Sequence, residues 1–245
     1  MKAEGSAKPV PENEFLQARI TRDKSVFIRS INPDVPLSEP VYAINWFNTR
    51  MLWLYNLYNL LGARAVGKVS GKACFKGKVK TVLHGAAEDR REMLLIVRYP
   101  APDHFKTMLE TTYFQLVSVL RVFAVRQFTF GFSRRSGASG TLQAWDKNKV
   151  FAIHHYRGQH DISAEVSRVV NDQGVEVNFS GRITAVLFSG DQTRPKDPVP
   201  CMMDGAIILQ AANQAALEKA VAHADYQAII QQTHSSFIAT AQRML

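Results

Sequence analysis

The chain has little cysteine and no long hydrophobic run. Its two cysteines, Cys74 and Cys201, lie far apart and show no metal-ligand spacing, which argues against a disulfide scaffold and against a zinc site. No stretch approaches the 18 apolar residues of a transmembrane helix. The opening segment MKAEGSAKPVPENEF also lacks the apolar region of a signal peptide. We therefore expect a reducing, cytoplasmic compartment, no bound metal and no membrane partner.

The chain also lacks the common catalytic motifs. It contains no glycine-rich phosphate loop, no G-x-S-x-G elbow, no H-E-x-x-H pair and no C-x-x-C pair. Nucleotide hydrolysis, serine-esterase chemistry and zinc-protease chemistry therefore have no support. Because no motif requires a cofactor, the sequence leaves the cofactor unidentified.

Acidic residues are outnumbered by basic ones, which gives the 245 residues a net charge of +9 and permits an anionic partner. Part of this excess lies between residues 64 and 80. One interpretation is a surface for nucleic acid or for an acidic partner. The favoured alternative is a solvated helix end followed by a lysine-guarded edge strand, because no stacking aromatics alternate with the lysines. The six basic residues are Arg64, Lys68, Lys72, Lys76, Lys78 and Lys80.

One strand-helix segment occurs twice in the sequence. Residues 98–121 recur at 210–233 with an offset of 112, so that Phe105 matches Leu217 and Phe114 matches Tyr226. VYAINWFN at 41–48 matches VFAIHHYR at 150–157, and a third pair of segments matches at an offset of 104. Self-similarity of this length predicts a duplicated structural unit.

Hydrophobic periodicity gives each unit the order strand, helix, strand, strand, helix, strand, which is the ferredoxin-like βαββαβ unit. The predicted fold is therefore α+β, with two tandem units over 41–135 and 150–245. An N-terminal arm over 1–40 and a linker over 136–149 complete the chain. A single helix over 103–125 is expected, and its predicted core-facing residues are Phe105, Met108, Leu109, Leu116, Val119, Leu120 and Phe123.

With both repeats aligned, the chain resembles the domain-of-unknown-function family 1330 of the dimeric α+β-barrel superfamily. In the first unit the matching residues are Asn45-Trp46-Phe47, Phe75–Val79, Val97–Pro100, Phe105, Met108, Phe114-Gln115 and Arg121. In the second unit Phe179–Ile183 and Asp225–Ile229 match. Departures are Thr233 at the position of the motif arginine, Ala211-Ala212 in place of Tyr-Pro, and Phe114 in place of the motif tyrosine.

The resemblance implies two four-stranded sheets that pack into one barrel with the helices outside. Because the two halves are covalently joined, the barrel is expected to close within one chain, and a homodimer of the tandem unit stays open. The superfamily's pockets lie between sheet and helices, and its members include cofactorless monooxygenases, heme enzymes and proteins without a known reaction. Fold alone therefore does not give function.

His154 and His155 are the most reactive candidates, because they replace Asn45 and Trp46 of the first repeat. Strand alternation sends the two histidines to opposite faces, so they cannot bind one metal from the same side. One of them could act as a general base or as an axial heme ligand. The alternative to a catalytic role is a structural one, in which the histidine is buried in the core and forms hydrogen bonds.

Arg121 is the third catalytic candidate and could anchor a ligand carboxylate, although such an arginine more often stabilises a helix end. The candidates for ligand contact are Asn45, Trp46, Tyr99, Phe114, Tyr156 and Tyr226. The first interpretation of function is binding of a small apolar or aromatic molecule. The alternatives are a cofactorless or heme-type oxidoreductase, and nucleic-acid binding through the basic run at 64–80.

Overall fold

A computed structural model describes residues 38–136, 146, 148–158, 160–189 and 204–244. Most of the predicted N-terminal arm and linker lies outside these residues, and so does Cys201. Two units of the same order form the described part. The first contains β1 (Val41–Thr49), α3 (Leu52–Lys68), β2 (Lys72–His84), η1 (Ala87–Asp89), β3 (Met93–Tyr99), α4 (Pro102–Glu110), α5 (Thr112–Ala124) and β4 (Val125–Arg135).

The second unit repeats this order with shorter helices. It contains β5 (Val150–Arg157), α6 (Ser163–Asn171), β6 (Glu176–Ser189), β7 (Gly205–Ala211), α7 (Gln214–Ala222), α8 (Ala224–Gln231) and β8 (Ser235–Arg243). The predicted α+β fold with two ferredoxin-like units is confirmed.

The eight strands form one closed barrel in the order β1-β3-β2-β8-β5-β7-β6-β4. Each unit supplies four adjacent strands, and the units join where β2 pairs with β8 and β4 pairs with β6, both antiparallel. Because closure pairs every strand on both sides, β2 is not an edge. The lysine-guarded edge interpretation is therefore wrong. Lys78 and Lys80 are exposed on the outer face of β2, whereas Phe75 and Val79 face inward.

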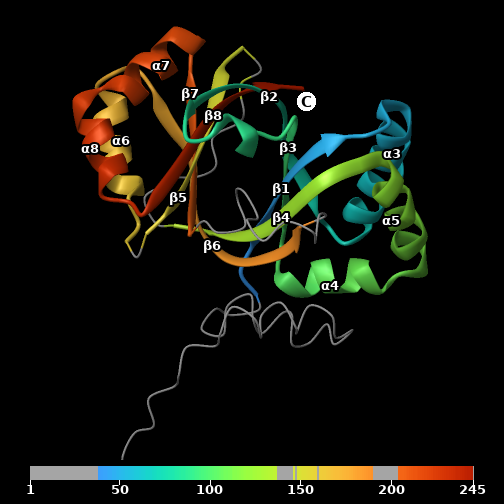
Figure 1. Ribbon diagram of the computed structural model, residues 1–245. Helices are drawn as coiled ribbons and strands as arrows, with labels where there is room; N and C mark the ends of the chain where they lie inside the picture. The colour runs from blue at the N-terminus through green and yellow to red at the C-terminus, as the bar shows by residue number, and fades with distance from the viewer. Residues whose placement is uncertain (1–37, 137–145, 147, 159, 190–203, 245) are drawn as a thin grey trace, which may run out of the picture.

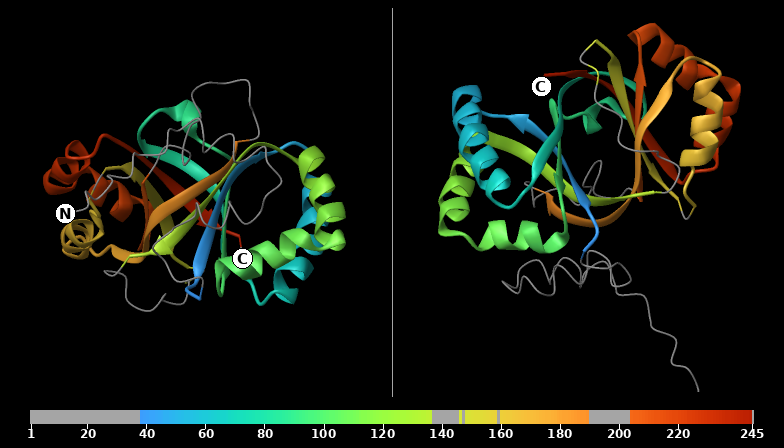
Figure 2. Two further views of the ribbon diagram at one scale, coloured as in Figure 1. Left: turned by 90° about the horizontal axis from the view of Figure 1, so that it is seen from below. Right: turned by 180° about the vertical axis from the view of Figure 1, so that it is seen from behind.

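Alternation along each strand separates a barrel interior from two outer layers. Large side chains from both units fill the interior, including Trp46, Phe75, Phe151 and Phe237, all of which are 1% exposed. The helices of the first unit and those of the second cover opposite sides of the barrel (Figures 1 and 2). Each outer layer therefore has its own space between sheet and helices.

The single helix predicted over 103–125 is wrong, because Thr111 divides it into α4 and α5. The Thr111 Oγ1 accepts a hydrogen bond from the Phe114 backbone N–H at 3.2 Å and caps α5. The break changes which face of α5 turns inward. Val117 and Ala124 are buried, whereas the predicted core residues Leu116, Val119 and Phe123 are exposed. The second unit breaks at His223, which is the matching position at an offset of 112.

Candidate functional site

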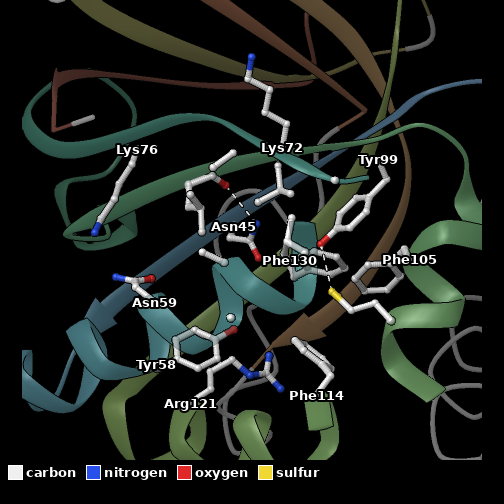
Figure 3. A pocket seen from close by; sticks show the side chains of 18 of the residues that line it. Asn45, Tyr58, Asn59, Lys72, Lys76, Tyr99, Phe105, Phe114, Arg121 and Phe130 are labelled. Carbon is white, nitrogen blue, oxygen red and sulfur yellow. Dashed lines mark hydrogen bonds between the residues drawn. The ribbon is translucent and has the colours of Figure 1, made fainter. Parts of the chain in front are cut away.

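A pocket of about 730 Å³ lies between the sheet and the helices of the first unit (Figure 3). This volume is within the range usual for small-molecule sites. The exposed lining residues Leu60 and Ala63 of α3 and Lys72 and Ala73 of β2 place its mouth between these two elements. The deeper lining comes from β1, β3, β4, α4 and α5, and it includes Asn45, Leu95, Val97, Tyr99, Phe105, Met108, Phe114, Arg121, Phe128 and Phe130.

The space is open because α3 packs mainly against α5, whereas its counterpart α6 packs mainly on β6 and α8. The Tyr113 hydroxyl donates a hydrogen bond to the Leu61 carbonyl at 3.1 Å and ties α5 to α3. Where α3 passes over the pocket it carries Gly62 and Ala63, which have little or no side chain to fill the space. A long helix with small residues over the sheet therefore leaves a cavity.

Arg121 brings a positive charge into this apolar space. Its guanidinium carbon lies 4.6 Å from the centre of the Phe128 ring, a cation–π contact that holds the side chain against the pocket wall. Figure 3 shows Arg121 between Tyr58 and Phe114. Burial raises the pKa of the Tyr58 hydroxyl, and the nearby Arg121 charge opposes that rise. This end of the pocket can therefore stabilise an anionic group.

The pocket's other two charges are also positive. Lys72 and Lys76 reach it from β2, and the Lys76 ammonium lies 4.9 Å from the centre of the Tyr55 ring. Burial lowers the pKa of Lys76. Among the described residues no aspartate or glutamate lines the pocket. Its electrostatic potential is therefore positive, and it favours an anion over a cation.

Asn45, Asn59 and Tyr99 supply neutral polar groups. The Asn45 side-chain amide donates to the carbonyls of Ala43 at 3.2 Å and Leu95 at 3.1 Å, which fixes its orientation. The Tyr99 hydroxyl lies 3.8 Å from the Met108 sulfur. The Asn59 amide nitrogen is buried beside the Tyr55 hydroxyl, and neither atom forms a well-aligned hydrogen bond within the described part of the chain.

Four of the nine predicted site residues line this pocket: Asn45, Tyr99, Phe114 and Arg121. Trp46 and His155 instead face the barrel interior. The Trp46 indole N–H donates to His155 Nε2 at 2.9 Å, and His155 Nδ1 lies 3.3 Å from the Gly205 carbonyl. Because Nε2 accepts, Nδ1 carries the proton. Burial lowers the pKa of His155 to about 3, which keeps the ring neutral.

His154, Tyr156 and Tyr226 lie between the sheet and the helices of the second unit. His154 Nδ1 is 3.0 Å from the Tyr226 hydroxyl, and its Nε2 is 3.0 Å from the Ser236 hydroxyl. Burial is the main cause that lowers the pKa of His154 to about 3. Tyr156 donates to the Asp161 carboxylate at 3.2 Å. Both histidines are fully buried with both ring nitrogens engaged, so the structure gives neither a place in the pocket.

The same geometry does not fit a heme ligated by His154 or His155. An axial histidine needs one ring nitrogen directed at the iron, and His154 and His155 use theirs on protein partners. No histidine or cysteine lines the pocket among the residues that the structure describes. The described residues also contain no group of three histidine, cysteine, aspartate or glutamate side chains able to hold a metal ion.

The predicted ligand contacts did not include Tyr58, Asn59, Lys72 and Lys76, which line the pocket. Strand alternation places Lys76 on the opposite face of β2 from Phe75, toward the helices. On α3, Tyr58 follows the buried Leu54 and Asn59 follows the buried Tyr55 by four residues, which is the spacing of one helix face. In the folded protein these side chains of α3 and β2 face the same pocket. The basic run is also divided, because Lys72 and Lys76 belong to the pocket whereas Lys78 and Lys80 lie farther along β2.

Comparison with known proteins identifies the fold and leaves the family open. No protein-family model and no curated protein matches the chain. An anthrone oxidase-like protein matches in structure with a TM-score of 0.51 and 11% identity, over 84% of this chain and 92% of that one. A candidate monooxygenase from Fusobacterium nucleatum matches with a TM-score of 0.50 and 8% identity, over 86% and 94%. The chain therefore has the fold of the dimeric α+β barrels. None of its described helices is long and apolar enough to cross a membrane.

Proposed function

We propose that the first unit binds a small, largely aromatic molecule that carries an acidic group. The observation that supports this proposal is the pocket of about 730 Å³, in which aromatic and aliphatic side chains surround a single deep arginine. The ring of the ligand would lie against Phe105, Phe114 and Phe130, and its acidic group would face Arg121. Lys72 and Lys76 would attract the anion to the mouth.

Two fluorescent naphthalenes form a matched pair of probes. 1-Anilinonaphthalene-8-sulfonate carries a sulfonate, and N-phenyl-1-naphthylamine is the same skeleton without it. We expect the wild-type protein to bind the sulfonate more tightly. Arg121→Gln should weaken sulfonate binding about tenfold, because a charge-assisted hydrogen bond is lost, and should leave the neutral probe nearly unchanged. Arg126→Gln is the matched control, since Arg126 is exposed just beyond α5.

The outcomes separate the two parts of this proposal. If neither probe binds, or if the pocket-narrowing variant Gly62→Leu does not weaken binding, the pocket is not the site. If Arg121→Gln weakens both probes equally, the pocket binds aromatic molecules but the acidic group is wrong. A native mass spectrum of freshly purified protein gives an independent check, because a co-purifying aromatic acid would be detected directly.

The finer assignments stay proposals. Membership of the domain-of-unknown-function family 1330 is supported by the Asn45–Phe47 and Phe114–Arg121 motifs, and cytoplasmic location is supported by the low cysteine content. The catalytic roles predicted for His154 and His155 also stay predictions, and the proposed binding site does not use them.

The alternative function is a cofactorless oxidoreductase that acts on an aromatic substrate in the same pocket. The Tyr58 hydroxyl and the Arg121 guanidinium favour it, since together they could stabilise a phenolate that reacts with oxygen. Anthrone is a suitable probe, because one structural relative is described as anthrone oxidase-like. Oxygen uptake that Arg121→Gln and Tyr58→Phe abolish would support this function. No uptake above the uncatalysed rate would leave only binding.

A further inference from the structure

The first unit exposes large apolar side chains on the outer side of its helices. Nine large apolar residues in the described part of the chain are exposed, and eight of them belong to α3 and α5. Trp53 is 68% exposed and Leu60 is 71% exposed, which is unusual for such residues on a free surface. The eight are Leu52, Trp53, Leu57, Leu60, Leu116, Val119, Val122 and Phe123. We refer to them as the α3/α5 face.

These residues share one side of the molecule. The Tyr113–Leu61 hydrogen bond joins the start of α5 to the later part of α3. At the other end, the backbone N–H groups of Arg50 and Met51 donate to the Ala124 carbonyl at 2.8 and 3.3 Å. The two helices therefore run antiparallel and side by side, as Figure 1 shows. Together the eight side chains present on the order of 800 Å² of apolar surface, more than the usual largest patch of a monomer.

The second unit shows that the fold does not require such a face. The outward positions of α6, α7 and α8 carry polar residues, among them Glu165, Arg168, Glu218, Lys219 and Asp225. No large apolar residue of these three helices is exposed. An exposed apolar face of this kind is typical of a docking site.

The charges around the face indicate what that partner is. Neither α3 nor α5 contains an aspartate or glutamate. Arg64 and Lys68 are exposed at one end of the face, and Arg50 and Arg126 at the other. Glu92 lies beside the Arg50 and Arg126 end, where its carboxylate accepts hydrogen bonds from Thr49 and interacts with Arg126. The four basic residues still outnumber this acid, and α3 and α5 offer a second copy no acid to pair with Arg64 and Lys68. An anionic lipid surface would neutralise the whole basic rim.

We propose that the α3/α5 face docks on an anionic lipid membrane. Trp53, Leu60 and Phe123 enter the boundary between headgroups and acyl chains, and the four flanking basic residues contact the headgroups. An apolar helical face with aromatic residues and a basic rim is the usual composition of such interfacial helices. The absence of a spanning segment led the sequence analysis to expect no membrane partner. Interfacial docking needs no such segment, and it does not depend on the proposed ligand.

The test is flotation of the full chain with vesicles of pure phosphatidylcholine and with vesicles that contain one quarter phosphatidylglycerol. We expect binding to the anionic vesicles and a blue shift of Trp53 emission, which Trp53→Phe removes. Leu116→Gln with Phe123→Gln should weaken binding at least tenfold, and neither residue lines the pocket. Arg64→Gln and Lys68→Gln should each weaken it roughly fivefold. Met244→Gln is the matched control, since Met244 is 53% exposed but lies outside the face, and it should have no effect.

Several results would overturn the proposal. One is equal flotation of wild type and the Leu116→Gln, Phe123→Gln variant, with circular dichroism showing that both are folded. Another is no flotation with anionic vesicles. A third is a concentration-dependent dimer in sedimentation analysis without lipid that the same two substitutions dissociate, because the face would then bind a second copy.

Discussion

The two units have the same fold but use the space between sheet and helices differently. In the first unit this space is the pocket. In the second unit it is filled by a continuous core that includes Val166, Leu217, Tyr226 and Ile229, each at most 5% exposed. The residues that make the difference occupy matching positions in the repeat. A duplicated scaffold can therefore keep one half as structure and leave the other half to bind.

Three matched positions show how this is achieved. Asn45, Phe114 and Arg121 line the pocket, and their counterparts are His154, Tyr226 and Thr233. The counterparts form hydrogen bonds within the second unit. His154 contacts the hydroxyls of Tyr226 and Ser236, and the Thr233 hydroxyl lies 2.9 Å from the Ser236 hydroxyl. The second unit thus encloses its polar groups in a local network. The first unit directs the corresponding groups into a cavity.

The largest expected effect comes from truncating the matched aromatic pair. Tyr226→Ala should cost about 4 kcal/mol of unfolding free energy, because it empties a fully packed site and removes the hydrogen bond to His154. Phe114→Ala should cost about 1 kcal/mol, since Phe114 already borders a cavity. Chemical denaturation of the two variants measures both values. If both substitutions lower the unfolding free energy by the same amount, the pocket of the first unit is not open in solution.

Much of this asymmetry could not be predicted from the sequence. Strand patterns and the repeat predicted the two α+β units and the opposite orientations of His154 and His155, because alternation follows local rules. The closed barrel was implied only by the resemblance to the dimeric α+β barrels. The break at Thr111 was missed, and it shifted the predicted inner face of α5 by part of a turn. The pocket itself depends on how α3 lies on α5, which is a tertiary packing effect that no local pattern encodes.

The next largest effect concerns acid stability, which should depend on the second unit. His154 and His155 have folded-state pKa values of about 3, below the unfolded value of 6.5. The unfolded chain therefore binds more protons between these pH values, and stability falls as the pH drops from about 6.5 toward 3. At pH 5 each histidine should cost on the order of 2 kcal/mol relative to pH 7.5.

Urea unfolding at pH 7.5, 6 and 5 measures this dependence. His154→Asn, which copies the residue of the first unit, should flatten the slope between pH 6.5 and 5 by about one proton. The carboxylates of Glu92 and Asp161, whose pKa values are lowered, titrate below this window. If the slope of the variant matches that of the wild type, His154 is not held neutral in the folded protein.

A smaller effect should separate stability from binding within α3. Gly62 lines the pocket, and an added methyl group would lie 3.8 Å from the Tyr58 ring, which is ordinary contact. Gly62→Ala should stabilise the protein by about 0.5–1 kcal/mol, because alanine favours a helix interior, and should weaken naphthalene-probe binding. Gly67→Ala is the control, since nothing lies near its new methyl group, and it should leave binding unchanged. Tighter binding by Gly62→Ala would place the ligand elsewhere.

The smallest effect concerns the mouth of the pocket. Lys76→Gln should weaken binding of the sulfonate probe about threefold, because a partly exposed lysine acts at a distance through solvent. Lys78→Gln removes the same charge from the same strand but outside the pocket lining, so it should change affinity less.

The contribution of Lys76 should also depend on pH. Burial lowers the pKa of Lys76 from the ordinary lysine value of 10.5. As the pH rises, Lys76 should therefore lose its positive charge, and with it its attraction for the sulfonate, before an ordinary lysine would. Fluorescence titrations at pH 7 and at pH 9.5 test this, and the Lys76→Gln variant should show a smaller change between the two. Equal effects of Lys76→Gln and Lys78→Gln would mean that only the overall charge attracts the ligand. The positive mouth would then no longer distinguish the first unit from the second.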